Sequence, residues 1–466
     1  MFANMMLLQL NERLFYQQLP SRPLQSDSKA SIAEDYKSYL EYYSTDHPTV
    51  WLPYQFRMIR FLVVVSSTIL LLFLLIFLSH KGVSDINVSE PTEHIPTKTL
   101  GGRLYCDREQ MKPSVEIPDD VNKVRPADLK VIAAMGDSIM VASLSKNFED
   151  DTSRNIYPGN SFVIGGDGTL AEQITVGKIL REFNRELVGL SRGAGYDNAG
   201  FNVAVGGMTS EDMPRQAKDL IERMKRDGVS LTEDWKIVTI FIGTNDIAKL
   251  RCHSQKEPIE RGEYKRNLFE AISLLRGNLN RTIVSVVSMW NSQLVFDAQS
   301  LIEEGKRMQC GDHYMEKRDV LCDEYRKVAY EVQNERAFDH KDFTVVVQGF
   351  MDNIRDAFRN KDGMYDKSFY GEDMFHLSKY GNAVLGKFLW NTMLEPVDQK
   401  SKKVDLGDES VPLKCPTKCC RFGFSHHTLF VMFFYLEKLV WLRLTEENNS
   451  ETIGREKILL QWPKFL

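Results

Sequence analysis

The sequence predicts an α/β protein in which a parallel sheet lies between layers of helices. Apolar runs of strand length alternate along the chain with stretches of helical pattern, as in consecutive βαβ units. The runs are almost continuously apolar, which is typical of parallel strands buried on both faces. The first run, Val131 to Met135, stops at Gly136-Asp137-Ser138, and in open α/β sheets such strand ends form the ligand site.

Composition supports a globular protein with a sizeable core and excludes one class of partner. The chain has 466 residues, 43% of them hydrophobic, and a net charge of −5 with a pI near 6.1. This charge gives no electrostatic basis for binding nucleic acid. Seven cysteines show no Cys-x-x-Cys spacing, which argues against a structural zinc site: Cys106, Cys252, Cys310, Cys322, Cys415, Cys419 and Cys420.

The amino-terminal region contains one segment suited to a membrane. After a polar segment, 1–57, to which we assign no chemistry, Phe61 to Ser79 is uncharged and 19 residues long, enough to span a bilayer as a helix. Within the predicted segment 58–84, two interpretations remain open. Arg57 and Arg60 predict a signal anchor with the rest of the chain outside the cell. Alternatively, translation starts at Met58 and the segment is a secretory signal peptide, cleaved after Ser84.

Either interpretation directs the rest of the chain to the secretory pathway, where disulfides persist. Cys310 and Cys322 are close enough in sequence to close a small loop. Cys106 and Cys415 flank the folded region and are placed to join its two ends. Acceptor sequons for N-glycosylation begin at three asparagines: Asn87, Asn280 and Asn448.

The predicted hydrolase-like domain spans 126–400, after a proline-rich and charged linker at 85–125. Its strands are predicted in this order: Leu129–Met135, Phe201–Val205, Trp235–Ile242, Thr282–Ser288 and Phe343–Gln348. Helices are predicted between and after them: Ala171–Glu182, Pro214–Arg226, Gly262–Asn278, Tyr314–Ala337 and Ser378–Met393, with Ser378 as an amino-terminal cap. The tail, 401–466, receives no predicted function.

Ser138 is the candidate nucleophile. A serine hydroxyl needs an adjacent base, and that base needs a third group to orient it. His376 is the best base in the chain, because Asp373 precedes it by three residues and a local turn would bring the carboxylate to the ring. Such a pair fixes the tautomer and stabilises the imidazolium formed on proton transfer.

The negative charge that develops on an ester carbonyl needs donors in fixed positions. Ser138 offers its backbone N–H, and Gly207 follows a predicted strand with no Cβ to obstruct its own N–H. Asn245, at the end of Phe241-Ile-Gly-Thr-Asn, offers a side-chain amide. All three stand at predicted strand ends and therefore form a candidate oxyanion hole.

The series Gly136-Asp-Ser138, Gly207, Gly243-Thr-Asn245-Asp and Asp373-x-x-His376 resembles the four blocks of the SGNH, or GDSL, hydrolases. The surrounding residues are similar to the membrane-associated phospholipase B branch. They include Arg125-Pro-Ala-Asp-Leu-Lys130, Gly165-Gly-Asp-Gly168, Glu211-Asp-Met-Pro214, Glu233-Asp-Trp-Lys236 and Leu389-Trp-Asn-Thr-Met-Leu-Glu-Pro396. Ile139 replaces the leucine that gives the GDSL motif its name. The resemblance covers roughly 106–396.

The resemblance implies a three-layer α/β/α sandwich with a parallel, flavodoxin-like sheet, and a serine ester hydrolase without metal or other cofactor. It implies Ser138 as nucleophile, His376 as base and Asp373 as its orienting acid, with Ser138, Gly207 and Asn245 as the oxyanion hole. The implied substrates are phospholipids, lysophospholipids or other acyl esters at a membrane surface. The implied location is a single-pass membrane protein with an extracellular or lumenal domain, or a secreted one.

Two other functions remain open. A short-chain esterase or glycan O-deacetylase would use the same fold and residues, because fold does not determine substrate. A catalytically silent, membrane-anchored binding protein is the second alternative. The intact set of serine, glycine, asparagine, aspartate and histidine argues against the silent protein.

Overall fold

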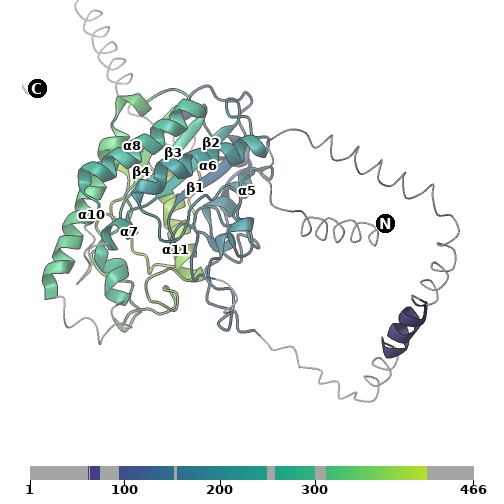
Figure 1. The fold of residues 1–466 in the computed structure, drawn as a ribbon. Helices are drawn as coiled ribbons and strands as arrows, with labels where there is room; N and C mark the ends of the chain where they lie inside the picture. Colours follow the sequence, from purple (N-terminus) through teal and green to yellow (C-terminus); the bar gives the residue numbers. More distant parts are fainter. Residues whose placement is uncertain are drawn as a thin grey trace, which may run out of the picture. The chain divides into compact units, whose positions relative to one another are not determined.

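The computed structural model describes residues 61, 63–73, 94–151, 155–248, 258–299 and 311–416. The chain divides into two compact units, Met1–Thr92 and Glu93–Leu466. The second unit contains the whole sheet and all the predicted site residues, and Figure 1 shows its strands and helices.

The central sheet has four parallel strands in the order β1-β2-β3-β4. Their bounds are β1 Leu129–Gly136, β2 Trp235–Phe241, β3 Thr282–Val287 and β4 Phe343–Gln348. Every residue of these strands is buried except Lys130, as expected for near-continuous apolar runs covered on both faces. The parallel arrangement places all four carboxyl ends at one edge, next to Ser138.

One predicted strand is wrong as an element. Phe201–Val205 runs parallel to β1, but only through an isolated bridge between Ala134 and Asn202. Ala134 N–H donates to the Phe201 carbonyl at 3.1 Å, and Val203 N–H donates to the Ala134 carbonyl at 2.9 Å. Gly200 before the segment and Gly207 after it have positive φ angles of 58° and 80°, which turn the chain away at both ends. If this segment is counted as an edge strand beside β1, the sheet has the flavodoxin-like order of strands.

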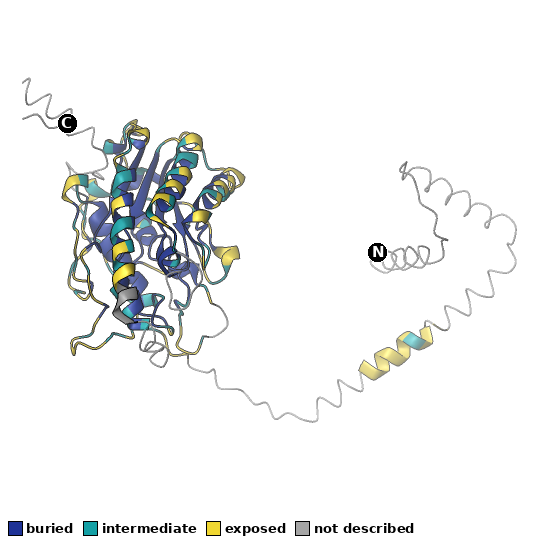
Figure 2. Cartoon of the chain, turned by 60° about the vertical axis from the view of Figure 1, so that its left-hand side comes forward, coloured by how far each residue is buried: buried dark blue, intermediate teal, exposed yellow. Residues whose placement is uncertain are grey.

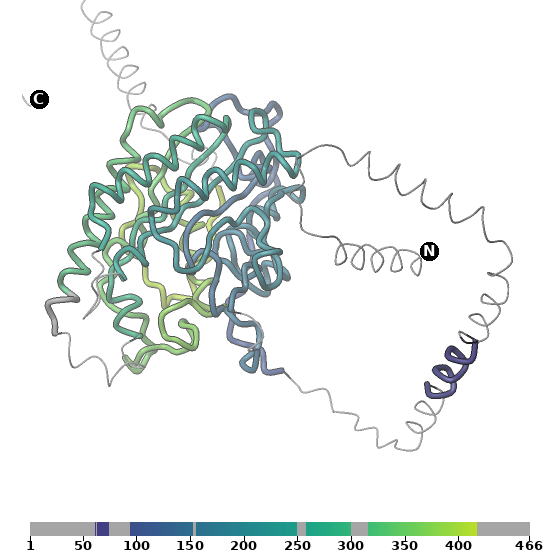
Figure 3. The backbone as a smooth tube through the Cα atoms, viewed as in Figure 1, coloured from purple at the N-terminus to yellow at the C-terminus, as the bar shows by residue number. Residues whose placement is uncertain are grey.

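Helices cover both faces of the sheet (Figure 1; Figure 2). The helices α6 Met213–Arg226, α8 Arg261–Asn278 and α10 Gly311–Gln333 pack side by side over one face. The helices α5 Val176–Phe183 and α11 Lys379–Met393 pack together on the other, and Figure 3 shows this late part of the chain beside the early part. The structure is therefore the predicted α/β/α sandwich.

Capping residues determine where two of these helices begin. Ser378 accepts the Gly381 N–H at 3.0 Å, which confirms the predicted cap of α11. The helix predicted from Ala171 begins instead at Val176, because the side chain of Thr175 accepts the Lys178 N–H at 3.1 Å. Thr175 also donates its hydroxyl to the Gly165 carbonyl at 2.6 Å, so it ties the start of α5 to the preceding loop.

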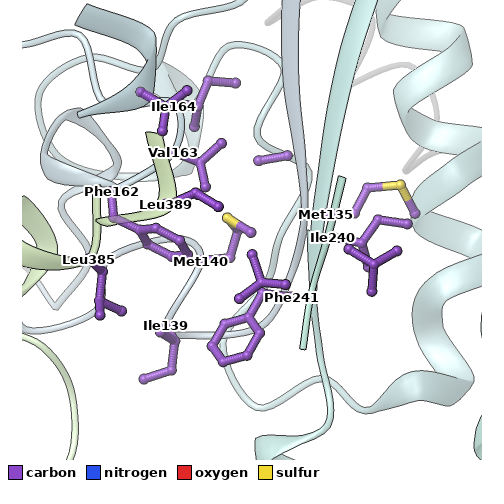
Figure 4. Close-up of a cluster of buried hydrophobic side chains, with 14 of the residues drawn as sticks. Met135, Ile139, Met140, Phe162, Val163, Ile164, Ile240, Phe241, Leu385 and Leu389 are labelled. Carbon is purple, nitrogen blue, oxygen red and sulfur yellow. The ribbon is translucent and has the colours of Figure 1, made fainter. Parts of the chain in front are cut away.

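The core lies on both sides of the strands. Figure 4 shows Met135 and Ile240 on one side and Phe241 on the other, facing Phe162 and Leu389 of the α11 side. All five are essentially without solvent exposure. Consecutive residues of β2 thus supply both layers, which is the alternation that a strand imposes.

Chain outside 126–400 also packs on the domain. In the predicted linker, Val121 is fully buried, and the Trp235 indole donates to the Pro118 carbonyl at 2.9 Å. Beyond residue 400, the described chain continues to 416, and the Trp390 indole donates to the Lys414 carbonyl at 2.9 Å. A disulfide between Cys106 and Cys415 joins these two arms across 309 residues of sequence, as the flanking positions of the two cysteines suggest.

The other cysteines behave differently. Cys322 is a free, buried thiol on α10, so the small loop to Cys310 is not closed. Burial raises the pKa of Cys322 to about 12, which keeps the thiol protonated. Cys252, Cys310, Cys419 and Cys420 lie outside the described residues.

Part of the predicted membrane segment is described. Residues 61 and 63–73 are helical, and the rest of 61–79 lies outside the described residues. Within the described ranges, none of the helices combines the length and the apolar character needed to cross a bilayer. Of the three sequons, only Asn280 is described; it is exposed, and its amide donates to Asp342 at 2.7 Å.

Candidate active site

Ser138 lies two residues beyond Gly136, the last residue of β1, where the neighbouring strand leaves room only for glycine. A Cβ on Gly136 would lie 2.2 Å from the Phe241 carbonyl oxygen of the neighbouring strand, far inside contact distance. The next residue, Asp137, closes the turn by accepting the Ile139 N–H on Oδ1 at 2.9 Å. Ser138 itself is buried, with 7% of its surface exposed.

The backbone of Gly136 is held by one side chain from α6. Gln216 accepts the Gly136 N–H at 2.9 Å and donates to the Gly136 carbonyl at 2.8 Å. Gln216 is itself 1% exposed. These two hydrogen bonds hold Gly136, the last residue of β1, two positions before the serine. No feature of the sequence predicts this role of Gln216.

His376 and Asp373 form the expected local pair. The ring Nδ1 lies 2.6 Å from Asp373 Oδ2, and the His376 backbone N–H donates to Oδ1 at 2.9 Å. Met374, between them, has φ of 53°, a strained conformation for a residue with a side chain, and it makes this tight turn possible. Burial disfavours the charge on Asp373, but its hydrogen bonds from His376 outweigh this effect and lower its pKa.

The other ring nitrogen of His376 is available. Nε2 is buried and has no hydrogen-bond partner among the described residues, so no bond to Ser138 is formed in this structure. The imidazole is nevertheless close enough to the serine turn to act electrostatically on Asp137. Burial raises the pKa of Asp137 to about 7, whereas the Ile139 N–H and the charge of His376 oppose that rise.

The predicted oxyanion-hole residues lie on one loop and the helix beside it. Gly207 has φ of 80°, and a Cβ there would meet no atom within 4 Å, so the space around it is open. Asn245 is the second residue of α7 Thr244–Ala248, after β2, and uses one amide hydrogen to bond the Met208 carbonyl at 2.9 Å. This bond holds Asn245 next to the Gly207 loop, and among the described residues the second amide hydrogen has no acceptor.

Two further residues secure that loop, and the sequence analysis did not identify their role. Asp246 accepts the Ser210 N–H at 3.0 Å and the Ser210 hydroxyl at 2.6 Å. The adjacent acidic residue in Gly243-Thr-Asn245-Asp246 was the available signal. The structure thus places Asn245 against the Gly207 loop and His376 against Asp373. Ser138 lies near the same loop, since a Cβ built on Gly206 would be 3.8 Å from Ser138 Cβ.

No metal-binding cluster accompanies these residues: within the described ranges, no three His, Cys, Asp or Glu side chains are grouped as metal ligands. The donors and acceptors present are an alcohol, an imidazole, a carboxylate, backbone amides and a carboxamide. Such a set performs nucleophilic attack with general acid and base assistance.

Comparison with known sequences gives consistent matches. The model of the family described as GDSL-like lipase/acylhydrolase matches residues 132–389. Membrane-associated phospholipase B1 of Homo sapiens is 34% identical over 332 residues, which are 68% of this chain and 22% of that protein. The Rattus norvegicus protein of the same name is 33% identical over 329 residues, with the same coverage. The chain therefore spans about a fifth of the length of these curated relatives.

Solved structures are more distant. A GDSL-like lipase, described as putative, from Parabacteroides merdae has 15% sequence identity and a TM-score of 0.31, covering 59% of this chain and 97% of that one. An acetyl xylan esterase from Geobacillus stearothermophilus has 15% identity and a TM-score of 0.28, covering 56% of this chain and 94% of that one.

Proposed function

Because this chain belongs to the GDSL-like lipase/acylhydrolase family, and is therefore a serine ester hydrolase, we propose that it releases fatty acids from phospholipids and lysophospholipids. The observation that supports the substrate class is the 34% identity to a membrane-associated phospholipase B1 over 332 residues. The proposed reaction needs no cofactor and proceeds through an acyl-enzyme on Ser138.

In the first step, Ser138 Oγ attacks the ester carbonyl while His376 Nε2 takes the hydroxyl proton. Nε2 supports this role because it is buried and has no hydrogen-bond partner among the described residues. The other ring nitrogen, Nδ1, lies 2.6 Å from Asp373, and this contact orients the ring. The charge of Asp373, stabilised by its bonds to His376, favours the imidazolium that results. A hydrogen bond from Ser138 to the ring would form as substrate binds, since such bonds are often absent in free enzymes.

The tetrahedral oxyanion is stabilised by the N–H groups of Ser138 and Gly207 and by the free amide hydrogen of Asn245. The bond between Asn245 and the Met208 carbonyl supports this assignment, since it fixes the carboxamide beside the Gly207 loop. His376 then protonates the departing alcohol or lysophospholipid. Water repeats the sequence on the acyl-enzyme and releases the fatty acid.

We further propose that the domain acts at a membrane surface in the secretory pathway. The disulfide between Cys106 and Cys415 supports an oxidising compartment, and the apolar segment 61–79 supports attachment or export. The relatives named as membrane-associated support the same location. Whether the segment remains as an anchor or is cleaved leaves the reaction unchanged.

The test measures fatty-acid release from a phospholipid and a lysophospholipid by the full chain in detergent micelles. We expect release from both, and loss of at least about 10³-fold in Ser138→Ala, since the nucleophile is removed. Ser410→Ala, an exposed serine of the carboxyl-terminal arm, is the matched control and should retain full activity. Ser138-dependent cleavage of acetyl esters without release from either lipid would replace this proposal with a short-chain esterase.

A further inference from the structure

Tyr196 lies beside the serine, in a loop that the predicted mechanism does not use. It begins the short helical turn Tyr196–Asn198 and is 45% exposed, so its side chain is accessible to a ligand. The loop is well fixed: Gly195 N–H donates to the Ile156 carbonyl at 3.1 Å, and Ala199 N–H donates to the Tyr196 carbonyl at 3.1 Å. The ring is therefore held by a hydrogen-bonded backbone, and its hydroxyl lies beside Gly206.

The hydroxyl of Tyr196 is engaged as an acceptor and available as a donor. Gly206 N–H donates to Tyr196 Oη at 3.0 Å, and this is the one hydrogen bond of the phenol within the described residues. A phenol has one proton to donate, and within the described part of the chain that proton has no acceptor. Accepting a hydrogen bond polarises the O–H group and strengthens it as a donor.

Gly206 marks where this hydroxyl lies relative to the nucleophile. A Cβ built on Gly206 would be 3.5 Å from Tyr196 Oη and 3.8 Å from Ser138 Cβ. The same point is 3.9 Å from the hydroxyl oxygen of Ser143. Two hydroxyls other than the nucleophile therefore converge on the residue that precedes the proposed oxyanion donor Gly207.

The backbone at Ser143 is strained, which indicates that its position matters. Ala142 and Leu144, on either side, both have φ of 58°, a left-handed conformation that is unfavourable for a residue with a side chain. The Ser143 N–H donates to the Ser138 carbonyl at 2.9 Å, so the strained turn folds back on the serine. Strain of this kind concentrates at ligand sites.

A free O–H at this place discriminates between the two halves of an ester. The acyl chain of a lipid carries no hydrogen-bond acceptor, and a phenol facing it would lose its bond to water without replacement. The alcohol half of a glycerol ester carries oxygens within a few bonds of the scissile ester. The hydroxyl therefore favours the alcohol half as its neighbour.

We propose that Tyr196 is a substrate-binding residue that donates its O–H to an oxygen of the alcohol half of the substrate. It thereby selects esters of glycerol or similar polyols over esters of plain alkyl alcohols. This inference rests on the proposed function, since it assigns the polar end of the substrate at the same Ser138 site.

The experiment compares Tyr196→Phe with the unmodified full chain on two substrates with one acyl chain. One is a lysophosphatidylcholine and the other is the ethyl ester of the same fatty acid, both in the same detergent micelles. We expect kcat/KM to fall roughly 10-fold for the lysophospholipid, as for one lost hydrogen bond, and to stay within about 2-fold for the ethyl ester. Tyr105→Phe, at a tyrosine that is 83% exposed on the amino-terminal arm, should change neither.

Two outcomes would overturn the inference. An equal loss on both substrates would show that Tyr196 acts on the scissile ester or through Gly206, whose acceptor the substitution also removes. No loss on either would show that the phenol does not touch the substrate. The Ser138→Ala variant distinguishes these two outcomes from failure of the proposed function. Lipid hydrolysis that survives in Ser138→Ala would refute the proposal that Ser138 is the nucleophile.

Discussion

Gln216 pairs with both backbone groups of Gly136, as acceptor of its N–H at 2.9 Å and donor to its carbonyl at 2.8 Å. In a longer sheet a neighbouring strand would satisfy these groups at the end of β1. Here the neighbouring segment reaches only the carbonyl, through the Val205 N–H at 3.3 Å, and a side chain of α6 bonds both groups and so holds the strand end that leads to Ser138. The turn that carries Ser138 is thus tied to the helix layer as well as to the sheet.

Removing this carboxamide should cost stability and activity together. In Gln216→Ala the buried Gly136 N–H loses its partner, which costs about 1–3 kcal/mol, and the Gly136 carbonyl keeps only its bond from the Val205 N–H at 3.3 Å. We expect the free energy of unfolding, measured by urea denaturation, to fall by about 2–4 kcal/mol, with a lower kcat. Gln216→Glu keeps the acceptor and should lose less than the alanine variant. Equal losses in the two variants would contradict the paired geometry.

Asp373→Asn should impair chemistry and leave binding largely intact. The amide cannot stabilise the imidazolium and favours the wrong tautomer of His376, which in a serine triad lowers kcat by about 10³–10⁴-fold. KM should change little, because Asp373 is proposed to orient the base and not to touch the substrate. Steady-state kinetics would measure both constants. Asp362→Asn, at an exposed residue, is the control, and a comparable fall there would remove the special role of Asp373.

Asp137 should make the protein less stable as the pH rises. Its pKa is about 7 in the folded protein, mainly through burial, against 3.8 for the ordinary group. The unfolded chain thus releases this proton first, and stability is lost between about pH 4 and pH 7. Asp137→Asn has no proton to release, so relative to the unmodified chain it should gain about 3 kcal/mol between pH 5 and pH 8. Denaturant unfolding of both proteins at pH 5 and pH 8 measures this difference. The same difference in unfolding free energy at both pH values would refute the raised pKa of Asp137.

Breaking the bond between Cys106 and Cys415 should lower thermal stability. Disulfides typically contribute about 2–4 kcal/mol by restricting the unfolded chain. Cys106→Ser and Cys415→Ser should each lower Tm, and the double variant should match the single ones because only one bond is lost. Additive losses would instead indicate separate packing roles for the two residues.

The sequence predicted most of the fold because the strands are long apolar runs with clear ends. The end of an apolar strand predicts Ser138, and a spacing of three residues predicts the pairing of Asp373 with His376. The structure places Asp373 and His376 in contact. The prediction of a strand at Phe201–Val205 is wrong. Its apolar pattern is that of a strand, but the glycines on both sides limit it to an isolated bridge. Gln216 and Tyr196 could not be predicted, since each acts on a backbone group distant in the chain and leaves no periodic signal.

The bond between the two arms also determines how a pulling force would travel through the molecule. Tension applied to the chain before residue 106 and after residue 415 passes through a single covalent link and bypasses the polypeptide between them. The strand ahead of Ser138 is consequently not part of the mechanical path. A domain held at a moving membrane surface could be stretched at its ends while the geometry around the serine stays under no load.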